Sequence, residues 1–318
     1  MNGVFLDSES LADLDLSALQ SLFDNLDVYE QTASNQTKER IHNAEVVVVN
    51  KVKLSRDIIQ SAPQLKLICL VATGTDNVDC LAAREHNITV CNCQAYGTDS
   101  VVQHVFSMIL ALHTNLIPYT QAVNKGKWQQ ASQFCLLNYP IVELKGRTLG
   151  IMGYGSLGKG VAKIAEAFGM HILLGQRPGT SQMGRIPLPE LLPQVDVLTL
   201  HCPLTGQTRN LIDKDTLHLM KPTSFLINAA RGGIVEETAL ADALRAGTIA
   251  GAATDVLTKE PPDSSNPLLA TDIPNLIITP HCAWGSYEAR VQIVAQTVEN
   301  INAFLTGLPK RVVNSIAP

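Results

Sequence analysis

The sequence predicts an α/β protein made of two doubly wound parallel-sheet domains. The chain has 318 residues, which is more than a single compact core usually accommodates. Short β-branched runs alternate with segments of helical period from the first residues onward, as in parallel sheets that carry helices on both faces. This alternation starts afresh near residue 147, after a long apolar helix.

The composition excludes several classes of protein. Hydrophobic residues make up 46% of the chain and charged residues 17%, so the chain folds into a globular structure. The net charge is −5 without a long basic cluster, and we expect no nucleic-acid binding. Apolar stretches fall far short of the roughly 20 residues that cross a bilayer, and no basic segment precedes an apolar one at the start. We therefore expect a cytoplasmic protein that does not enter a membrane.

The seven cysteines predict no disulfide framework. Their number is odd and their spacing irregular, so we expect buried free thiols. Cys91 and Cys93 lie inside an apolar run without a second Cys/His pair nearby, which indicates the core of a strand. We expect no metal site.

The first domain is expected to comprise residues 1–98 together with 285–318. The expected order of its segments is strand 3–6, helix 11–26, strands 28–31 and 45–50, segment 59–63, strand 66–71, helix 78–86 and strand 88–93. An amphipathic helix over 286–305 returns the chain to this domain.

The second domain is expected over residues 99–284. It opens with a helix over 101–116, for which Asp99 or Ser100 can serve as the cap. This helix is apolar on nearly all faces, so it needs burial, either between domains or in a subunit interface. The expected strands follow at 147–152, 171–174, 195–200, 224–228, 249–254 and 276–279.

A glycine-rich turn gives the clearest chemical signal. The strand over 148–152 runs into Gly153, Gly155 and Gly158, and a helix follows. The first glycine allows the tight turn, the second lets a pyrophosphate approach the backbone, and the third allows close helix packing. Free N–H groups at the helix N-terminus then face the phosphates. The turn predicts dinucleotide binding.

The end of the next strand bears on the choice of cofactor. NAD-selective sites usually place a carboxylate there for the adenosine ribose. This chain instead has Gln176 and Arg177, and a guanidinium can pair with a 2′-phosphate. We expect NADP(H) to be favoured, with NAD(H) possible. The alternative is a solvated loop arginine, with the preference decided elsewhere.

Further motifs resemble those of the D-isomer-specific 2-hydroxyacid dehydrogenases, closest to the glycerate dehydrogenase or hydroxypyruvate reductase group. The similarity extends from about residue 67 to 287. The matching stretches are ATGTDNVD from residue 72, YGTDSVVQH from 96, HCPLT from 201, TRNLI from 208, MKP from 220, INAARGG from 227, ATDV from 253, EP from 260 and TPH from 279.

The resemblance implies a flavodoxin-like substrate domain, a Rossmann nucleotide-binding domain and an active site between them. It also implies hydride transfer between NAD(P)H and a small 2-oxo acid held by Arg231, while His281 protonates the oxygen and Glu260 stabilises the imidazolium. Hydroxypyruvate or glyoxylate is the expected substrate. Substrate contacts are implied at Thr73, Gly74, Thr75 and Arg231. Cofactor contacts are implied at Gly153, Gly155, Ser156, Leu157, Gly158, Gln176, Arg177, Cys202, Pro203, Thr208, Ala229, Ala230, Asp255 and His281.

Two other interpretations stay open. A formate or phosphite dehydrogenase has a similar fold, although formate dehydrogenases carry Gln where this chain has Glu260. A corepressor-like protein would bind the nucleotide as a conformational ligand and show negligible turnover. The resembling enzymes pair through the helix at 101–116, so we expect a homodimer.

Overall fold

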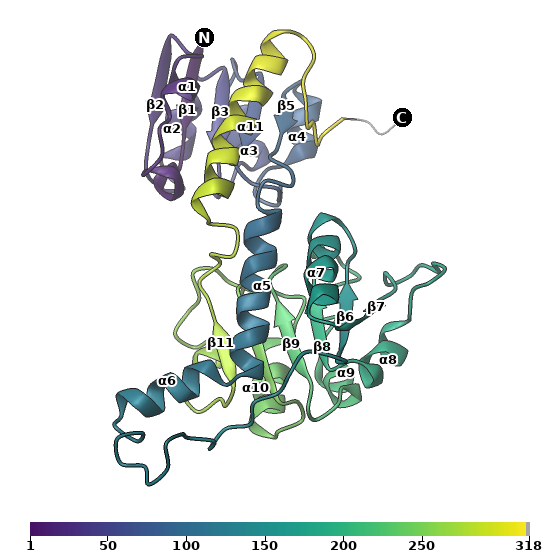
Figure 1. Ribbon diagram of the computed structural model, residues 1–318. Helices are drawn as coiled ribbons and strands as arrows, with labels where there is room; N and C mark the ends of the chain where they lie inside the picture. The colour runs from purple at the N-terminus through teal and green to yellow at the C-terminus, as the bar shows by residue number, and fades with distance from the viewer. Residues whose placement is uncertain (316–318) are drawn as a thin grey trace. The chain divides into compact units, whose positions relative to one another are not determined.

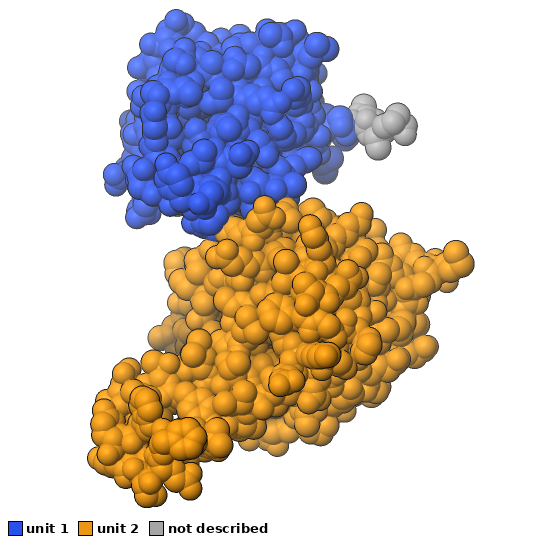
Figure 2. All heavy atoms as spheres, in the orientation of Figure 1, with its two compact units in different colours: residues 1–97, 285–318 blue, residues 98–284 orange. Residues whose placement is uncertain are grey.

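The chain forms two compact units in a computed structural model that describes residues 1–315 (Figure 2). Unit 1 contains residues 1–97 and the C-terminal segment from residue 285 onward, and unit 2 contains Thr98–Trp284. Each unit is built around one parallel sheet (Figure 1). The predicted fold class is confirmed.

The sheet of unit 1 has the strand order β2-β1-β3-β4-β5. Its strands are β1 (Asn2–Phe5), β2 (Asn25–Val28), β3 (Val46–Val49), β4 (Leu67–Leu70) and β5 (Thr89–Cys91). Its helical elements are η1 (Glu9–Leu11), α1 (Ser17–Gln20), α2 (Thr37–Ile41), α3 (Arg56–Gln60), α4 (Cys80–Glu85) and α11 (Tyr287–Leu305).

Successive residues of these strands are buried on opposite faces of the sheet. Val47 and Ile68 pack in one cluster with Ile59 of α3. Their neighbours Val48 and Cys69 are also fully buried, on the other face, and α11 packs against β4. Burial on both faces explains why the strands read as continuous apolar runs.

Two expectations for the start of unit 1 are wrong. In place of a helix over 11–26 the chain forms the short η1 and α1, and the next strand begins at Asn25 rather than at residue 28. The Asp15 carboxylate accepts the backbone N–H of Ser17 at 2.8 Å, which starts a new helix instead of continuing one. Pairing of Asn25 with Asn2 in β1 sets the strand.

The sheet of unit 2 has the strand order β11-β10-β9-β8-β6-β7. Its strands are β6 (Thr148–Met152), β7 (His171–Leu174), β8 (Val197–Leu200), β9 (Phe225–Asn228), β10 (Gly251–Thr254) and β11 (Leu276–Ile278). Its helical elements are α5 (Thr98–His113), α6 (Leu116–Asn124), α7 (Ser156–Ala167), α8 (Leu188–Leu191), η2 (Leu192–Gln194), α9 (Lys214–Leu219), α10 (Glu237–Arg245) and η3 (Pro267–Leu269).

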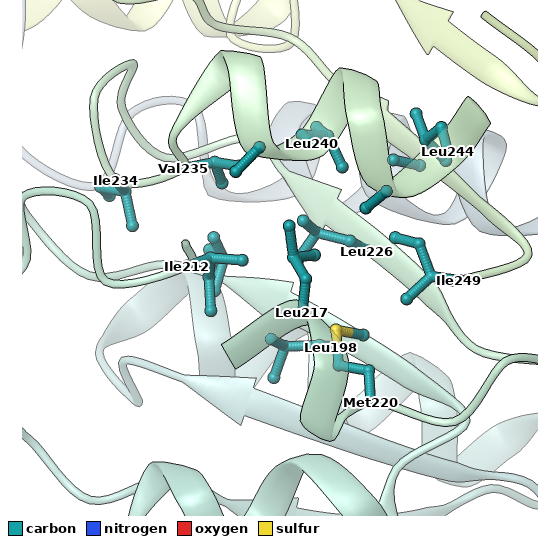
Figure 3. Packing of buried hydrophobic residues seen from close by; sticks show 14 of the residues in the cluster. Leu198, Ile212, Leu217, Met220, Leu226, Ile234, Val235, Leu240, Leu244 and Ile249 are labelled. Carbon is teal, nitrogen blue, oxygen red and sulfur yellow. The ribbon is translucent and has the colours of Figure 1, made fainter. Parts of the chain in front are cut away.

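Helices cover both faces of this sheet. On one face Leu198 and Leu226 of the strands pack with Leu217 of α9 and with Leu240 and Leu244 of α10 (Figure 3). The alternate strand residues pack on the other face with α5 and α7, among them Val197, Ile227 and Ala253. The carboxyl ends of all six strands lie at one edge, where open α/β sheets bind ligands.

The apolar helix α5 is buried within its own unit. It packs against α7, β9 and β10, and Val105 and Ile109 are fully buried there. The sequence left open whether this helix is buried between domains or in a subunit interface; in the structure, the sheet of its own unit and α7 cover its apolar residues. Exposed apolar side chains lie instead on α6 and the segment after it; they are Leu116, Ile117, Val123, Trp128, Phe134, Leu137 and Ile141.

Within residues 1–315, no single helix has the length and apolar composition to cross a membrane. Helices α5 and α6 pass that test only as a pair, across a break at which the chain bends by 63°.

Candidate active site

The predicted functional side chains of unit 2 follow the carboxyl ends of neighbouring strands. The glycine turn follows β6, Arg231 follows β9, Glu260 lies on the loop after β10, and His281 lies just after β11. Because β9, β10 and β11 are adjacent in the sheet, Arg231, Glu260 and His281 start from the same edge. The chain crosses from β7 to β8 on the other side of β6, which creates the switch point where such sheets bind nucleotides.

The three glycines of the turn differ in what requires them. Gly153 has φ of +94°, and a Cβ there would lie 2.6 Å from the carbonyl carbon of His201. A Cβ at Gly158 would lie 2.2 Å from the Gly153 oxygen. Gly155 has ordinary φ, and a Cβ there would meet no atom within 4 Å. Close packing therefore requires glycine at positions 153 and 158. At position 155 no neighbouring atom excludes a side chain, so the space beside it is free.

This open space lies at the N-terminus of α7. Gly155 is the N-cap of that 12-residue helix and offers no side-chain cap, so the first N–H groups, which include those of Ser156 and Leu157, point toward whatever binds there. A pyrophosphate fits these donors and the positive end of the helix dipole. When bound, a nicotinamide dinucleotide would be held by this turn and would supply a hydride.

The loop after β7 carries arginines and no acidic residue. Arg177 is exposed, and the Gln176 amide donates a hydrogen bond to the Thr180 carbonyl within the same loop. The guanidinium of Arg185 lies 5.0 Å from the ring centroid of Tyr154, a residue of the glycine turn. Arg185 was missed in the sequence, because only the fold brings it next to that turn.

Hydrogen bonds around Arg231 fix the turn after β9. The buried Asn228 accepts the Ala230 N–H at 3.1 Å, and its amide donates to the Arg231 carbonyl at 3.1 Å. The guanidinium of Arg231 donates to the Ala230 carbonyl at 2.8 Å. The half-buried Arg231 therefore leaves the strand from a turn of defined shape.

Glu260 and His281 form a close pair. The Oε2 atom of Glu260 lies 2.5 Å from Nδ1 of His281, and Oε1 accepts the Leu257 N–H at 2.9 Å. The side chains are 33% and 25% exposed, so solvent and small molecules can reach the pair. With Nδ1 directed at the carboxylate, the proton that His281 can exchange with a substrate is on Nε2.

The backbone at His281 is held in an unusual conformation. Its φ is +53°, which is uncommon for a residue other than glycine. The His281 N–H donates to the carbonyls of Asp255 and Thr279 at 2.8 and 3.0 Å. The buried Asp255 carboxylate accepts the N–H groups of Cys282 and Ala283 at 3.0 and 2.9 Å. Asp255 therefore fastens the segment that presents the histidine.

Three of the nearby side chains could in principle ligate a metal. His104 Nε2, an Asp255 oxygen and the Cys282 sulfur all lie within 4.8 Å of one another. However, the same Asp255 oxygen accepts the Thr279 hydroxyl at 2.5 Å, and that hydroxyl oxygen lies 2.9 Å from His104 Nε2. Hydrogen bonds through Thr279 and Asp255 thus explain why these side chains lie close together.

Comparison with known proteins identifies the family. The sequence profile described as "D-isomer specific 2-hydroxyacid dehydrogenase, NAD binding domain" matches residues 106–283. The chain is 45% identical to the glycerate dehydrogenase of Methylorubrum extorquens over 98% of both chains. It is 36% identical to the hydroxypyruvate reductase of Blautia hydrogenotrophica over 99% of this chain and all of the relative. The chain belongs to the D-isomer-specific 2-hydroxyacid dehydrogenases.

Solved structures agree with this family. An NADPH-dependent glyoxylate/hydroxypyruvate reductase from Sinorhizobium meliloti, in complex with NADP and malonate, is 27% identical, with a TM-score of 0.83 over 98% of this chain and 96% of that one. A D-lactate dehydrogenase from Aquifex aeolicus, complexed with NAD and lactic acid, is 29% identical, with a TM-score of 0.84 over 99% and 100%. The chain is therefore an oxidoreductase that uses a nicotinamide cofactor.

Other predicted contacts of this dehydrogenase lie in ordered turns. The Thr208 hydroxyl donates to the Pro203 carbonyl at 2.7 Å, which shapes the turn that begins at Cys202. Ala229 is buried beside Ala230, directly after β9. Their contacts with the cofactor stay predictions, as does the contact of Asp255 with the nicotinamide.

The predicted substrate loop lies in unit 1, after β4. The Thr73 hydroxyl donates to the Cys93 carbonyl at 2.9 Å, and the Asn92 amide donates to the Thr73 carbonyl at 2.7 Å. The carbonyl of Thr75 accepts the Val78 N–H at 3.0 Å. Hydrogen bonds thus order both sides of Gly74. The role of this loop toward a substrate carboxylate stays a prediction.

His201 was overlooked in the sequence, where only its motif was used. Burial lowers its pKa to about 4, so the ring is neutral near pH 7. Its Nε2 lies 2.9 Å from the Thr199 hydroxyl, and Nδ1 is buried with no hydrogen-bond partner among the described residues. Nothing in the local sequence reveals this, because the burial comes from the fold.

Proposed function

We propose that this dehydrogenase reduces hydroxypyruvate or glyoxylate, with Arg231, Glu260 and His281 as its catalytic residues. The Glu260–His281 pair carries the proposal, since a carbonyl that receives a hydride also needs a proton on its oxygen. The names of the relatives support this choice of substrate, and the reverse reaction oxidises D-glycerate or glycolate.

Each residue has a defined task in this proposal. The guanidinium of Arg231 holds the substrate carboxylate and the carbonyl oxygen by charge-assisted hydrogen bonds. Nε2 of His281 delivers its proton to that oxygen as the alcohol forms. The Glu260 carboxylate fixes the proton of Nδ1 and stabilises the imidazolium before the transfer. The nicotinamide supplies the hydride.

We infer that NADPH is preferred over NADH. Arg177 in the loop after β7 supports this, together with Arg185 beside Tyr154 of the glycine turn, because guanidinium groups in this loop favour a 2′-phosphate. A carboxylate that would repel such a phosphate is missing from residues 175–178. Relatives of known structure bind either cofactor, so the preference has to be measured.

A screen of substrates and cofactors tests the proposal. The oxidation of NADPH and NADH is followed at about 340 nm with hydroxypyruvate, glyoxylate, pyruvate, 2-oxoisocaproate and oxaloacetate. We expect the highest kcat/KM for hydroxypyruvate or glyoxylate with NADPH. Negligible turnover with every acid would contradict the proposed activity and favour a cofactor-sensing binding protein.

We also propose a homodimer. The exposed apolar side chains on α6 and the following segment support it, since Phe134 is 91% exposed and Leu137 is 76% exposed. Burial of such side chains by a second copy removes them from water. Light scattering at micromolar concentration should return twice the chain mass. A value near 34.3 kDa would contradict the proposal.

A further inference from the structure

The loop that carries Glu260 is held at two points by one carboxylate. Glu237, the first residue of α10, accepts the backbone N–H of Thr258 with Oε1 at 2.6 Å. Its other oxygen accepts the Asn266 amide at 2.8 Å. Thr258 lies two residues before Glu260 and Asn266 lies six after it. Glu237 therefore connects the two ends of the segment 258–266.

The far end of this segment is fixed in turn by Asn266. While its amide donates to Glu237, its Oδ1 accepts the Leu268 N–H at 2.9 Å and caps η3. Leu268 is buried in the core of unit 2. The orientation of the Asn266 amide is thus determined from both sides, since a flipped amide would lose both hydrogen bonds.

The near end of the segment lies against the residue that follows Arg231. A Cβ built on Gly232 would come within 1.9 Å of the Leu257 carbonyl oxygen and 2.6 Å of the Thr258 nitrogen. The two main chains are therefore in direct contact. Leu257 also donates its N–H to Oε1 of Glu260. The backbone that Glu237 and Gly232 fix thus holds the catalytic carboxylate itself.

We propose that Glu237 is a positioning residue for the reaction: it holds the 258–266 loop in the register that places Glu260 against His281. This inference rests on the proposed catalytic role of the Glu260–His281 pair. Glu237 acts through the loop, since its two oxygens accept hydrogen bonds from Thr258 and Asn266, while the pair itself meets at Nδ1 and Oε2. Small displacements of a catalytic group reduce rates strongly, so the loop register affects turnover.

A double-mutant cycle tests this. Glu237→Ala should lower kcat roughly ten- to a hundredfold, because Glu260 is no longer held in place against His281. The Kd of the reduced cofactor should stay unchanged. In a Glu260→Gln background, Glu237→Ala should cost much less, since residues that act through one another are not additive. The control is Glu236→Ala, which removes the adjacent carboxylate at a position with no side-chain cap hydrogen bond.

An exchange of the hydrogen-bond partners Glu237 and Asn266 distinguishes a loss of loop positioning from a general loss of stability. Glu237→Gln sets an amide donor against the Asn266 amide, and Asn266→Asp sets two carboxylates against each other. Each single variant should lose activity. The combination of Glu237→Gln with Asn266→Asp restores a donor opposite an acceptor, and it keeps the acceptors for Thr258 and Leu268. It should recover most of the kcat.

The outcomes separate this inference from the proposed function. A normal kcat in Glu237→Ala, beside a defective Glu260→Gln enzyme, would overturn the inference and leave the catalytic pair intact. Losses that add fully in the double variant, or no recovery by the exchange, would also overturn it. A fully active Glu260→Gln enzyme would remove the catalytic role of Glu260, and the inference with it.

Discussion

The two halves of the unit 2 sheet contribute to the site in different ways. Beside β6 and β7 the chain offers main-chain N–H groups at the glycine turn and the exposed Arg177. After β9, β10 and β11 it offers the side chains of Arg231, Glu260 and His281. Hydrogen bonds tie Arg231 and Glu260 to their own turn and loop, and Glu260 in turn contacts His281. A dinucleotide would thus contact mainly main-chain N–H groups, whereas the reacting atoms of a substrate would contact side chains held in fixed positions.

The largest expected effect comes from the half of the sheet that ends in catalytic side chains, formed by β9, β10 and β11. His281→Ala or Arg231→Ala should lower kcat/KM by roughly 10²- to 10⁴-fold, because each removes a group that acts on the substrate. Binding of NADPH should stay close to that of the wild type. Steady-state kinetics beside a cofactor fluorescence titration measures both quantities. A variant with wild-type turnover would remove that residue from the mechanism.

The next effect comes from the half of the sheet formed by β6 and β7 and concerns the selectivity between NADPH and NADH. Replacing Gln176 by Asp and Arg177 by Ala should invert the preference from NADPH to NADH. A charge-assisted contact contributes about 1.5 to 3 kcal/mol, or roughly ten- to more than a hundredfold. The ratio of kcat/KM values for the two cofactors reports this change. If the wild type already uses both cofactors equally, Arg177 does not read the 2′-phosphate.

The glycines of the turn allow a matched comparison within this half. Gly155→Ala should leave the thermal midpoint unchanged and raise the Kd of the cofactor about tenfold, because its Cβ would enter only the open space. Gly158→Ala should lower the midpoint, since its Cβ overlaps the Gly153 oxygen. Equal losses of stability in both variants would show that Gly155 is structural.

One substitution examines the Glu260–His281 pair. In Glu260→Gln an amide replaces the carboxylate that faces Nδ1 of His281, so the ring loses its charged partner and kcat for reduction should fall. The rate of NADPH oxidation measures this. A wild-type kcat would make Glu260 a structural loop residue.

The smallest expected effect comes from His201, at the boundary between the halves. Burial lowers its pKa to about 4 in the folded protein, against about 6.5 when it is exposed. Below pH 6.5 His201 is protonated in the unfolded chain but stays neutral in the native state. His201 therefore leaves the free energy of unfolding unchanged above pH 6.5 and lowers it as the pH falls toward 4. His201→Asn should reduce the loss of the urea midpoint between about pH 7.5 and 5. An identical loss in wild type and variant would contradict this.

The sequence predicted the two parallel sheets and the order of the site residues, because alternating apolar segments and the glycine turn are local signals. The sequence-based predictions were wrong or incomplete where contacts between residues distant in the sequence determine the structure. The segment before Asn25 forms no long helix, since pairing with β1 sets the strand there. Helix α5 is covered by its own sheet, which its composition does not reveal. Arg185 and Glu237 act on segments that only the fold brings near them.

The carboxylate of Asp255 contacts the main chain at residues 282 and 283. The chain can therefore exchange the exposed side chain at residue 282 over evolution while the histidine keeps its place, so long as the backbone follows the same path, whereas Ala283 is also confined by its burial in the core. Asp255 has no such freedom, because an amide in its place would set a donor against an N–H group. Among related sequences, variation should thus concentrate on residue 282 and spare Asp255.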